Sequence, residues 1–508
     1  MKFATSPETV LERLTALRAH DAPTHGGHVL SYVYDSGEPE LDRLAGEAIR
    51  AMQPVNGLDP TTFGSVAALE RDLVGFTRDL LGGDDEVVGT VTSGGTESCL
   101  LAVKTARDAW LAAHGLRPGE ARPRLVLPTT AHAAFRKAAH YFGLETDLVP
   151  VTATGEVTAA AVAERVSGPA AHDVALVVVS APSYPHAALD PVADVAAVAA
   201  DAGVPVHVDA CIGGMALPFW PDLPDWDLRV PGVTSLSVDL HKYGYAPKGV
   251  SVLLQRGRDR QRGQYFATTR WPGYPVVNPT LLGSRSGGPL AAAWAIVQAL
   301  GHEGFAELAG RSRRATDALR DAVGAVEGLR VVGDPVGPLL AVATDDAVPA
   351  ERRVDPHRWA DAATAHGWVL QAQPAYSQED GTRLPHTTHL TVTPVTESVL
   401  GELVPALEAA ADAVRGEPRP DATALLAALP AAGAPADGVP GADPGTLDAE
   451  TAAGLLGALG LDASRLGDDG PGVGPMAPLL AAVEALPAPM AERLLTELLA
   501  RLVEPRRP

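Results

Sequence analysis

The residues with the clearest chemical potential lie in the stretch VTSLSVDLHKYGYAPKG, at residues 233–249. Its first half reads as a buried strand that ends at the pair His241 and Lys242. The chain holds five lysines against 35 arginines, which favours a chemical role for a lysine in this position. A lysine amine attacks a carbonyl group when burial lowers its pKa and leaves it neutral. We therefore interpret Lys242 as an amine that forms a Schiff base, with an ordinary surface lysine in a turn as the alternative.

A glycine-rich turn earlier in the chain has the composition of an anion site. A short valine-rich strand meets the sequence SGGT at 93–96, and a long amphipathic helix is predicted from Glu97. Glycines at a strand-to-helix turn let backbone N–H groups approach an anion, and the helix dipole favours its charge. The sequence therefore predicts a phosphate site at Gly94, Gly95 and Thr96. A tight turn in which Thr96 caps the helix is the alternative.

Polar residues follow several apolar strands in the region after residue 122. The strands alternate with helical patterns, which indicates a largely parallel sheet covered by helices on both faces. Ligands of such sheets bind beyond the carboxyl ends of the strands. One polar residue at a strand end is usually a cap or a loop residue, but several together predict a shared site. The candidates are His132, His186, Asp190, Asp209 and Lys242.

Six segments together resemble a known enzyme family. They are TSGGTES (92–98), TAHAAFRKAAHYFG (130–143), SYPHAALDPV (183–192), HVDACIGG (207–214), SVDLHKYGYAPKG (237–249) and GSRSGG (283–288). In this order they closely resemble the pyridoxal-phosphate-dependent group II decarboxylases, with the sphingosine-1-phosphate lyase branch nearest, over about residues 25–400. The resemblance implies a fold-type-I α/β fold, with a mostly parallel seven-stranded sheet between helices and a smaller C-terminal α/β domain. It also implies pyridoxal 5'-phosphate as the cofactor and a homodimer.

The resemblance implies catalytic roles for Lys242, Asp209 and His132. Lys242 would bind the cofactor covalently and later move protons at the substrate carbon. Asp209 would pair with the ring nitrogen of the cofactor and keep it protonated, and His132 would stack over the ring. Each role is one that the chemistry of this cofactor requires.

The resemblance also implies a set of residues that bind the cofactor. The glycine-rich turn, with His241, would hold the cofactor phosphate. Ser284 and Arg285 would lie near the phosphate of the second subunit. His186 belongs to a loop that departs from the family pattern Pro-His-Gly by carrying Ala187. The full set is Gly94, Gly95, Thr96, His132, His186, Asp209, His241, Lys242, Ser284 and Arg285.

The length of 508 residues suggests two or three domains. We expect helices at 39–51, 61–82, 156–166 and 303–327, and a strand near 390–394. The predicted parts are an N-terminal arm (1–60), a large cofactor-binding domain (61–295), a small α/β domain (296–414), a linker rich in Pro, Ala and Gly (415–445) and a helical C-terminal appendage (446–508). The appendage lies outside the resemblance, and a small packing unit is its simplest interpretation.

The composition limits the classes of partner. A net charge of −22 argues against nucleic acid and anionic membranes, because the chain shows no concentrated basic patch. The N-terminus lacks the apolar core of a signal peptide, and no apolar run reaches membrane-spanning length. Two cysteines form no disulfide framework, which fits the cytoplasm, and no metal-binding motif is present. The expected partners are a small amine or amino-acid substrate and a second copy of the chain.

The predicted strand THLTVT reduces the number of reaction types that the sequence supports. Aminotransferases that resemble this chain carry an arginine before that strand to hold the substrate carboxylate, whereas Thr388 and His389 stand here. This favours carbon–carbon cleavage over transamination. We expect retro-aldol cleavage of a phosphorylated amino alcohol, with amino-acid decarboxylation as the alternative and an aminotransferase or a non-catalytic scaffold less favoured.

A phosphorylated substrate would need a second anion site. Lys248, Arg270 or the segment around His25 and Tyr32 are the candidates for it.

Overall fold

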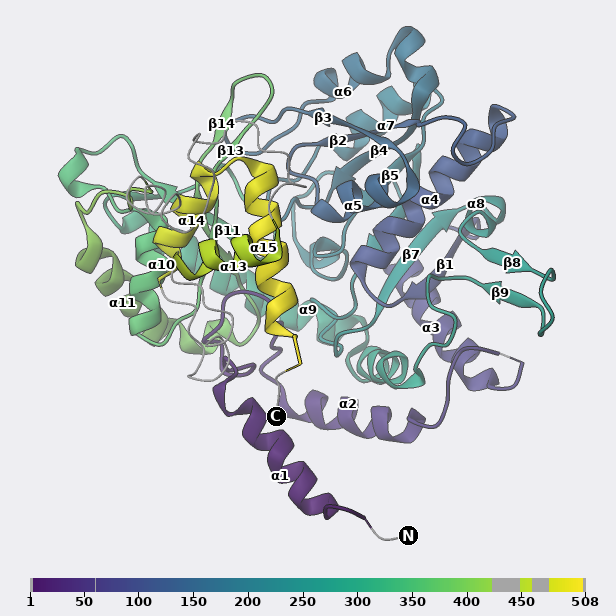
Figure 1. Cartoon of the computed structure of the whole chain (residues 1–508), viewed down its shortest axis with the longest axis horizontal. Coiled ribbons are helices and arrows are strands. Elements are labelled where there is room, and N and C mark those ends of the chain that lie inside the picture. Colours follow the sequence, from purple (N-terminus) through teal and green to yellow (C-terminus); the bar gives the residue numbers. More distant parts are fainter. Residues whose placement is uncertain (1–2, 60, 423–447, 459–474, 506–508) are drawn as a thin grey trace.

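A seven-stranded sheet forms the centre of the larger part of the molecule in the computed structural model, which describes residues 3–59, 61–422, 448–458 and 475–505 (Figure 1). The strand order is β1-β7-β6-β5-β4-β2-β3, and β7 runs antiparallel to both of its neighbours. The remaining neighbours pair in parallel, which confirms the predicted fold class. The strands are β1 (Val87–Thr92), β2 (Arg124–Pro128), β3 (Glu145–Val149), β4 (Val174–Ser180), β5 (Val206–Asp209), β6 (Val233–Val238) and β7 (Ser251–Arg256).

The central strands are apolar on both faces because helices cover both sides of the sheet. Every residue of β4 is buried, and so is every residue of β5. In the pairing register Ser180 lies opposite Asp209, and Asp209 lies opposite Ser237. The carboxyl ends of these three strands are therefore level, and the residues that follow them meet at one edge of the sheet.

Two helices of this part begin where the local sequence supplies a side-chain cap. The His132 side chain accepts a hydrogen bond from the Ala134 N–H at the start of α5, and Thr158 caps α6. The predicted start of α4 is corrected, since the helix begins at Gly95 with Gly94 as its N-cap, rather than at Glu97 with a Thr96 cap. The helices are α2 (Pro39–Met52), α3 (Gly64–Leu80), α4 (Gly95–Ala113), α5 (Ala133–Phe142), α6 (Ala159–Val166), α7 (Val192–Asp201) and α8 (Arg258–Arg262).

A four-stranded antiparallel sheet forms the core of the second part, in the order β10-β11-β15-β12. Helix α9 (Gly287–Ala325) joins the two parts and kinks at Gly301, where φ is 55°, so the predicted helix 303–327 is only its second half. The other elements are β8 (Phe266–Thr268), β9 (Val276–Asn278), β10 (Leu329–Val331), β11 (Leu339–Thr344), α10 (Pro356–Ala365), β12 (Gln371–Gln373), β13 (Tyr376–Ser377), β14 (Arg383–Leu384), β15 (Thr387–Thr391) and α11 (Thr396–Val414).

The N-terminal segment connects the two parts of the molecule. Helix α1 (Pro7–Leu17) has no buried residue and extends away from the body in Figure 1. The Leu30 N–H then donates to the Val369 carbonyl at 2.9 Å, and the Leu30 side chain is buried in the core of the second part. This anchor fixes the chain just before Tyr32 and Tyr34, which enter the site described below.

Helices α13 (Ala449–Ala458), α14 (Met476–Ala485) and α15 (Ala488–Leu502) form the C-terminal appendage beside α10 (Figure 1). They share a small apolar core that includes Leu455, Leu456 and Leu494. Asp361 of α10 accepts the first two N–H groups of α14, from Met476 and Ala477, at 2.8 and 2.9 Å. Most of the predicted linker lies outside the described residues. None of the described helices has the length and apolar character to cross a bilayer.

Candidate active site

A cavity of about 610 Å³ opens around Lys242, and we call it the lysine cavity. Its walls come from the carboxyl ends of β4, β5 and β6, the start of α4, the N-terminal segment and β12. Of the predicted residues, it is lined by Gly94, Gly95, Thr96, His132, Asp209, His241 and Lys242. It is also lined by residues to which the sequence analysis assigned no role, among them Cys99, Tyr184, Cys211, Asp239 and Gln371.

Lys242 forms a buried ion pair with Asp239. The distance from Lys242 Nζ to Asp239 Oδ2 is 2.9 Å, and Asp239 is 2% exposed. Burial lowers the pKa of Lys242, but Asp239, Cys211 and Tyr34 together outweigh burial, with the Asp239 carboxylate foremost, and hold the pKa above the usual lysine range. The expectation that burial leaves this amine neutral is therefore wrong for the ion-paired state. Asp239 was missed, although its position three residues before Lys242 in VDLHK was a usable signal.

His241 lies on the other side of the same carboxylate. Its Nε2 is 3.6 Å from Asp239 Oδ2, and its Nδ1 accepts the Val250 N–H at 3.3 Å. Burial lowers the pKa of His241 to about 4, so the imidazole is neutral at neutral pH. The ring borders Gly94, because a Cβ atom built there would lie 3.3 Å from His241 Cε1.

The start of α4 forms a cradle that only a glycine fits. A Cβ atom at Gly95 would lie 2.7 Å from Asp239 Oδ2 and 2.8 Å from Cys211 Sγ. The first N–H groups of a helix have no partner within the helix, and the helix dipole makes this end attractive to anions. The Gly94-Gly95-Thr96 turn lies at the wall of the lysine cavity in the position that the predicted phosphate site requires, and its role there stays a prediction.

Asp209 is the last residue of β5, and neighbouring groups donate hydrogen bonds to its carboxylate. The Cys211 N–H donates to Asp209 Oδ1 at 3.1 Å, and the Ser237 hydroxyl donates to the same oxygen at 3.4 Å. Ser237 Oγ is also 3.2 Å from Nε2 of the buried His207. These contacts orient a carboxylate that lines the cavity while the residue itself is only 8% exposed.

The rim of the lysine cavity carries a second cation. Lys248 Nζ lies 4.5 Å from the centre of the Tyr34 ring and donates to the His241 carbonyl at 3.2 Å. Partial burial, together with the charge of Lys242, lowers the pKa of Lys248 to about 8. Opposite, the Tyr184 hydroxyl donates to Gln371 of β12.

The residue at the place of the missing arginine lies behind Tyr184. The His389 ring stacks on the Tyr184 ring with 4.2 Å between their centres. His389 is fully buried, and burial lowers its pKa to about 3. A neutral imidazole in this position offers no charge to a substrate carboxylate.

Three predicted residues are not brought into the lysine cavity. His186 is buried beneath Gly155, where a Cβ atom would lie 2.7 Å from its ring, and burial lowers the pKa of His186 to about 4. Ser284 and Arg285 belong to a different region of the surface. The cofactor roles of these three residues stay predictions.

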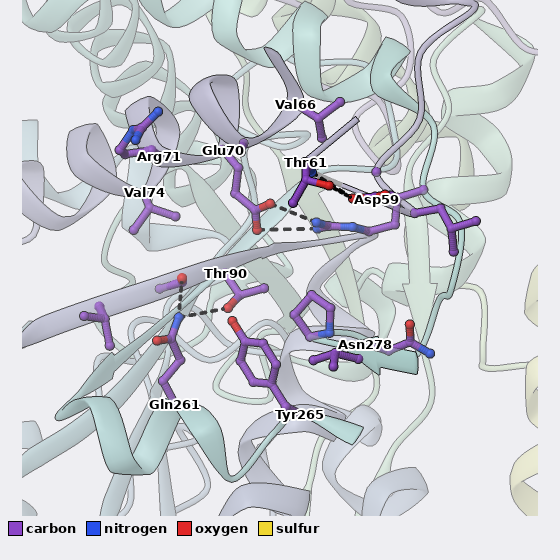
Figure 2. A pocket seen from close by; sticks show the side chains of 18 of the residues that line it. Asp59, Thr61, Val66, Glu70, Arg71, Val74, Thr90, Gln261, Tyr265 and Asn278 are labelled. Atoms are coloured by element: carbon purple, nitrogen blue, oxygen red, sulfur yellow. Dashed lines mark hydrogen bonds and ion pairs between the residues drawn. The ribbon is translucent and has the colours of Figure 1, made fainter. Parts of the chain in front are cut away.

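Arg285 lines a larger cavity of about 1270 Å³, here called the outer cavity, between α3, β1 and the β8–β9 hairpin. Arg285 donates to Glu70 Oε2 at 2.8 Å and to the Val91 carbonyl at 2.6 Å. Figure 2 shows Glu70, Thr90 and Tyr265 around this space. Although it is the larger of the two, the outer cavity lacks the lysine, the glycine cradle and the buried carboxylates, so we place the candidate active site at the lysine cavity.

Comparisons with known proteins agree with this location. Residues 40–341 match the family model described as the pyridoxal-dependent decarboxylase conserved domain, and residues 420–501 match the model described as the pyridoxal-dependent enzyme C-terminal putative HTH domain. The chain is 36% identical to sphingosine-1-phosphate lyase 1 of Rattus norvegicus over 368 residues, which cover 72% of this chain and 62% of the relative. It is 33% identical to sphingosine-1-phosphate lyase of Oryza sativa subsp. japonica over 422 residues, covering 81% and 74%.

Solved structures extend the likeness to the fold. A sphingosine-1-phosphate lyase of Burkholderia pseudomallei matches with a TM-score of 0.73 and 33% identity, over 81% of this chain and 92% of that chain. A glutamate decarboxylase of Lactobacillus brevis shares the fold, with a TM-score of 0.70 and 20% identity over 82% and 95% of the two chains. The chain matches less than two thirds of the length of the rat, mouse and Dictyostelium discoideum lyases.

Proposed function

Because the chain belongs to the family of pyridoxal-dependent decarboxylases, we propose that it is a pyridoxal 5'-phosphate-dependent carbon–carbon lyase that cleaves phosphorylated amino alcohols. The support comes from relatives that are named sphingosine-1-phosphate lyase and are at least 30% identical over most of this chain. Sphingosine 1-phosphate is itself a phosphorylated amino alcohol. The geometric observation that carries the proposal is the second cation, Lys248, at the rim of the cavity that holds Lys242.

The residues around the lysine cavity fit the cofactor. The start of α4 offers N–H groups to its phosphate, with the neutral His241 beside them. Lys242 is the amine that would hold it covalently, and the Asp209 carboxylate would hold a proton on its ring nitrogen. His132 lines the same cavity and would lie against the ring face. When bound, pyridoxal phosphate accepts the electron pair left by the bond that breaks at the amine-bearing substrate carbon.

The chain's own residues would then direct the cleavage. Lys248 and the hydroxyl of Tyr34 would bind the substrate phosphate at the rim, away from the cofactor phosphate. The bond between the amine-bearing carbon and the hydroxyl-bearing carbon breaks, and the hydroxyl gives its proton to water and becomes the carbonyl of an aldehyde. The amine-bearing carbon gains a proton, for which Lys242 Nζ is the proposed donor, and leaves as a phosphorylated amine.

The lysine assignment is tested by trapping the cofactor. Borohydride reduction of the purified protein should attach the cofactor irreversibly to the peptide that contains Lys242, as read by mass spectrometry. Lys242→Ala should abolish the attachment, whereas Lys137→Ala, at an exposed lysine on α5, should leave it unchanged. A reducible covalent adduct that persists in Lys242→Ala would contradict the assignment.

The reaction is tested by following two products separately. A phosphorylated amino alcohol should yield an aldehyde, and the same compound without phosphate should react much more slowly. A panel of amino acids offered to the same preparation should release no carbon dioxide. Carbon dioxide without aldehyde would make amino-acid decarboxylation the function instead.

We also propose that the protein forms a homodimer and that it is located in the cytoplasm. Exposed apolar side chains near the outer cavity support the dimer, because such patches mark protein contacts: Phe266, Trp271, Tyr274, Val277, Leu281 and Leu282. A second copy on this face would bring Ser284 and Arg285 towards the neighbour's cofactor. The free thiols of Cys99 and Cys211 support a reducing compartment. Fractionation of the native cells tests the location, and recovery in the membrane fraction would contradict it.

A further inference from the structure

Two cysteines and a carboxylate from different parts of the chain meet in the wall of the lysine cavity. Cys99 lies in the second turn of α4, Asp209 ends β5, and Cys211 follows two residues later. The two sulfur atoms and one carboxylate oxygen all lie within 4.8 Å of one another. All three residues line the cavity, so an ion that enters it can reach them.

The contacts within this cluster are weak. The Cys211 thiol donates to Ser237 Oγ at 3.4 Å, and the Ser237 hydroxyl donates to Asp209 Oδ1 at 3.4 Å. Both distances are long for strong hydrogen bonds. The Cys211 N–H bond to Asp209 Oδ1, at 3.1 Å, is shorter and involves the backbone, so the two thiols can turn towards a shared ion while this bond stays in place.

We propose that Cys99, Cys211 and Asp209 form a binding site for a thiophilic divalent cation such as Zn²⁺, and that this metal and pyridoxal phosphate exclude each other. Two thiolates and one carboxylate are donors that zinc favours. Tetrahedral zinc holds such atoms roughly 3.6 to 3.8 Å apart. Since the three atoms already lie within 4.8 Å, small side-chain rotations complete the site.

Metal binding here conserves atoms and charge. Each thiol gives its proton to solvent, and the ion exchanges three bound waters for two sulfurs and one oxygen. The cavity supplies a water as the fourth ligand. Three features oppose a cation: the Lys242 ammonium, the positive end of α4 and the raised pKa of the buried thiols of Cys99 and Cys211. Asp239 already neutralises the first at 2.9 Å.

The exclusion follows from a shared carboxylate and rests on the proposed function. Asp209 is the group assigned to the cofactor ring nitrogen, and a cation on its carboxylate would repel the protonated nitrogen that this carboxylate is proposed to stabilise. Gly95 brings the start of α4 close to the same sulfur, since a Cβ atom there would lie 2.8 Å from Cys211 Sγ. The metal site and the proposed cofactor site therefore occupy the same wall.

The test uses the full chain freed of cofactor, kept reduced by a phosphine, with Cd²⁺ as a spectroscopic probe. Cd²⁺ should bind once per chain with the ultraviolet absorption of thiolate coordination, and Zn²⁺ should displace it. Cys99→Ser and Cys211→Ser should each weaken binding by more than the roughly 10- to 100-fold that loss of an outer-shell partner costs. Ser235→Ala, which removes a hydroxyl that contacts His207 at 2.8 Å, should leave affinity unchanged.

Addition of pyridoxal phosphate should release the bound Cd²⁺, and saturating Zn²⁺ should slow the return of the cofactor. If neither cysteine substitution weakened Cd²⁺ binding, the proposed metal site would be wrong. The two substitutions lie on different elements, so if one variant misfolds, the other still provides the test. Metal that stays bound in the cofactor-loaded chain would overturn the exclusion. Because metal binding is read without turnover, absence of lyase activity would count against the proposed function alone.

Discussion

At the residue scale, the role proposed for Asp209 predicts that its charge is needed for turnover but not for cofactor binding. Asp209→Asn keeps an oxygen that can accept the Cys211 N–H, which now donates at 3.1 Å, but it has no negative charge to keep the ring nitrogen protonated. We expect the variant to bind the cofactor and to lose roughly 100- to 1000-fold in kcat. Parallel measurement of kcat and of the cofactor Kd checks this.

A second buried aspartate provides the control for that experiment. Asp190 accepts the Ser180 N–H at 2.7 Å, and burial raises the pKa of Asp190 to about 7, so its neutral form is already accessible. Asp190→Asn should therefore leave kcat close to that of the parent. A normal kcat in Asp209→Asn would show that turnover does not depend on the charge of Asp209.

The pKa of Lys248 predicts how substrate binding depends on pH. Burial and the neighbouring Lys242 lower this pKa to about 8, and only the ammonium form attracts a phosphate. The KM for a phosphorylated substrate should therefore rise as the pH increases through about 8. Lys248→Arg should abolish the rise, because a guanidinium stays charged. An identical pH profile in the arginine variant would show that another group is responsible.

At the scale of the element, the close approach of α4 to the strand ends should control cofactor binding. Gly95→Ala would place a Cβ atom 2.7 Å from Asp239 Oδ2 and 2.8 Å from Cys211 Sγ, so the start of the helix must move. We expect a stability loss of about 1–3 kcal/mol and weaker cofactor binding. Thermal unfolding and a cofactor titration measure the two effects.

The matched control is a helical glycine with free space around it. A Cβ atom at Gly46 of α2 would meet nothing within 4 Å. Gly46→Ala should stabilise the chain by about 0.5–1 kcal/mol, because alanine is the better helix former, without changing cofactor affinity. If Gly95→Ala behaved like Gly46→Ala, the cradle would not be sterically closed.

At the scale of the whole molecule, the apolar face beside the outer cavity should hold two copies together. Trp271 and Leu281 are 45% and 52% exposed on it. We expect light scattering to give the mass of two chains, and the double variant Trp271→Asp and Leu281→Asp to give one. Leu499→Asp, on α15 and 65% exposed, should not change the mass. A parent protein with the mass of one chain would contradict the dimer.

The sequence by itself determined the fold class and the family, and it predicted the central lysine. These conclusions depend on features that are local in the chain: the apolar strands, the turn at Gly94 and Gly95, and the HKYGYAPKG segment. A resemblance carried by contiguous segments survives without knowledge of how the segments pack. For the same reason helix existence was predicted well, whereas the start of α4 and the length of α9 were not.

Only the tertiary structure decided which side chains meet. Asp239 lies within one turn of Lys242 in sequence, yet their ion pair depends on how the strand end folds back. Cys99 and Cys211 come together because α4 packs on β4, β6 and β7, beside the residues that follow β5, and Arg285 joins Glu70 through the packing of α3 beside β1. Contacts between residues distant in the chain are set by sheet order and packing, which no local pattern encodes.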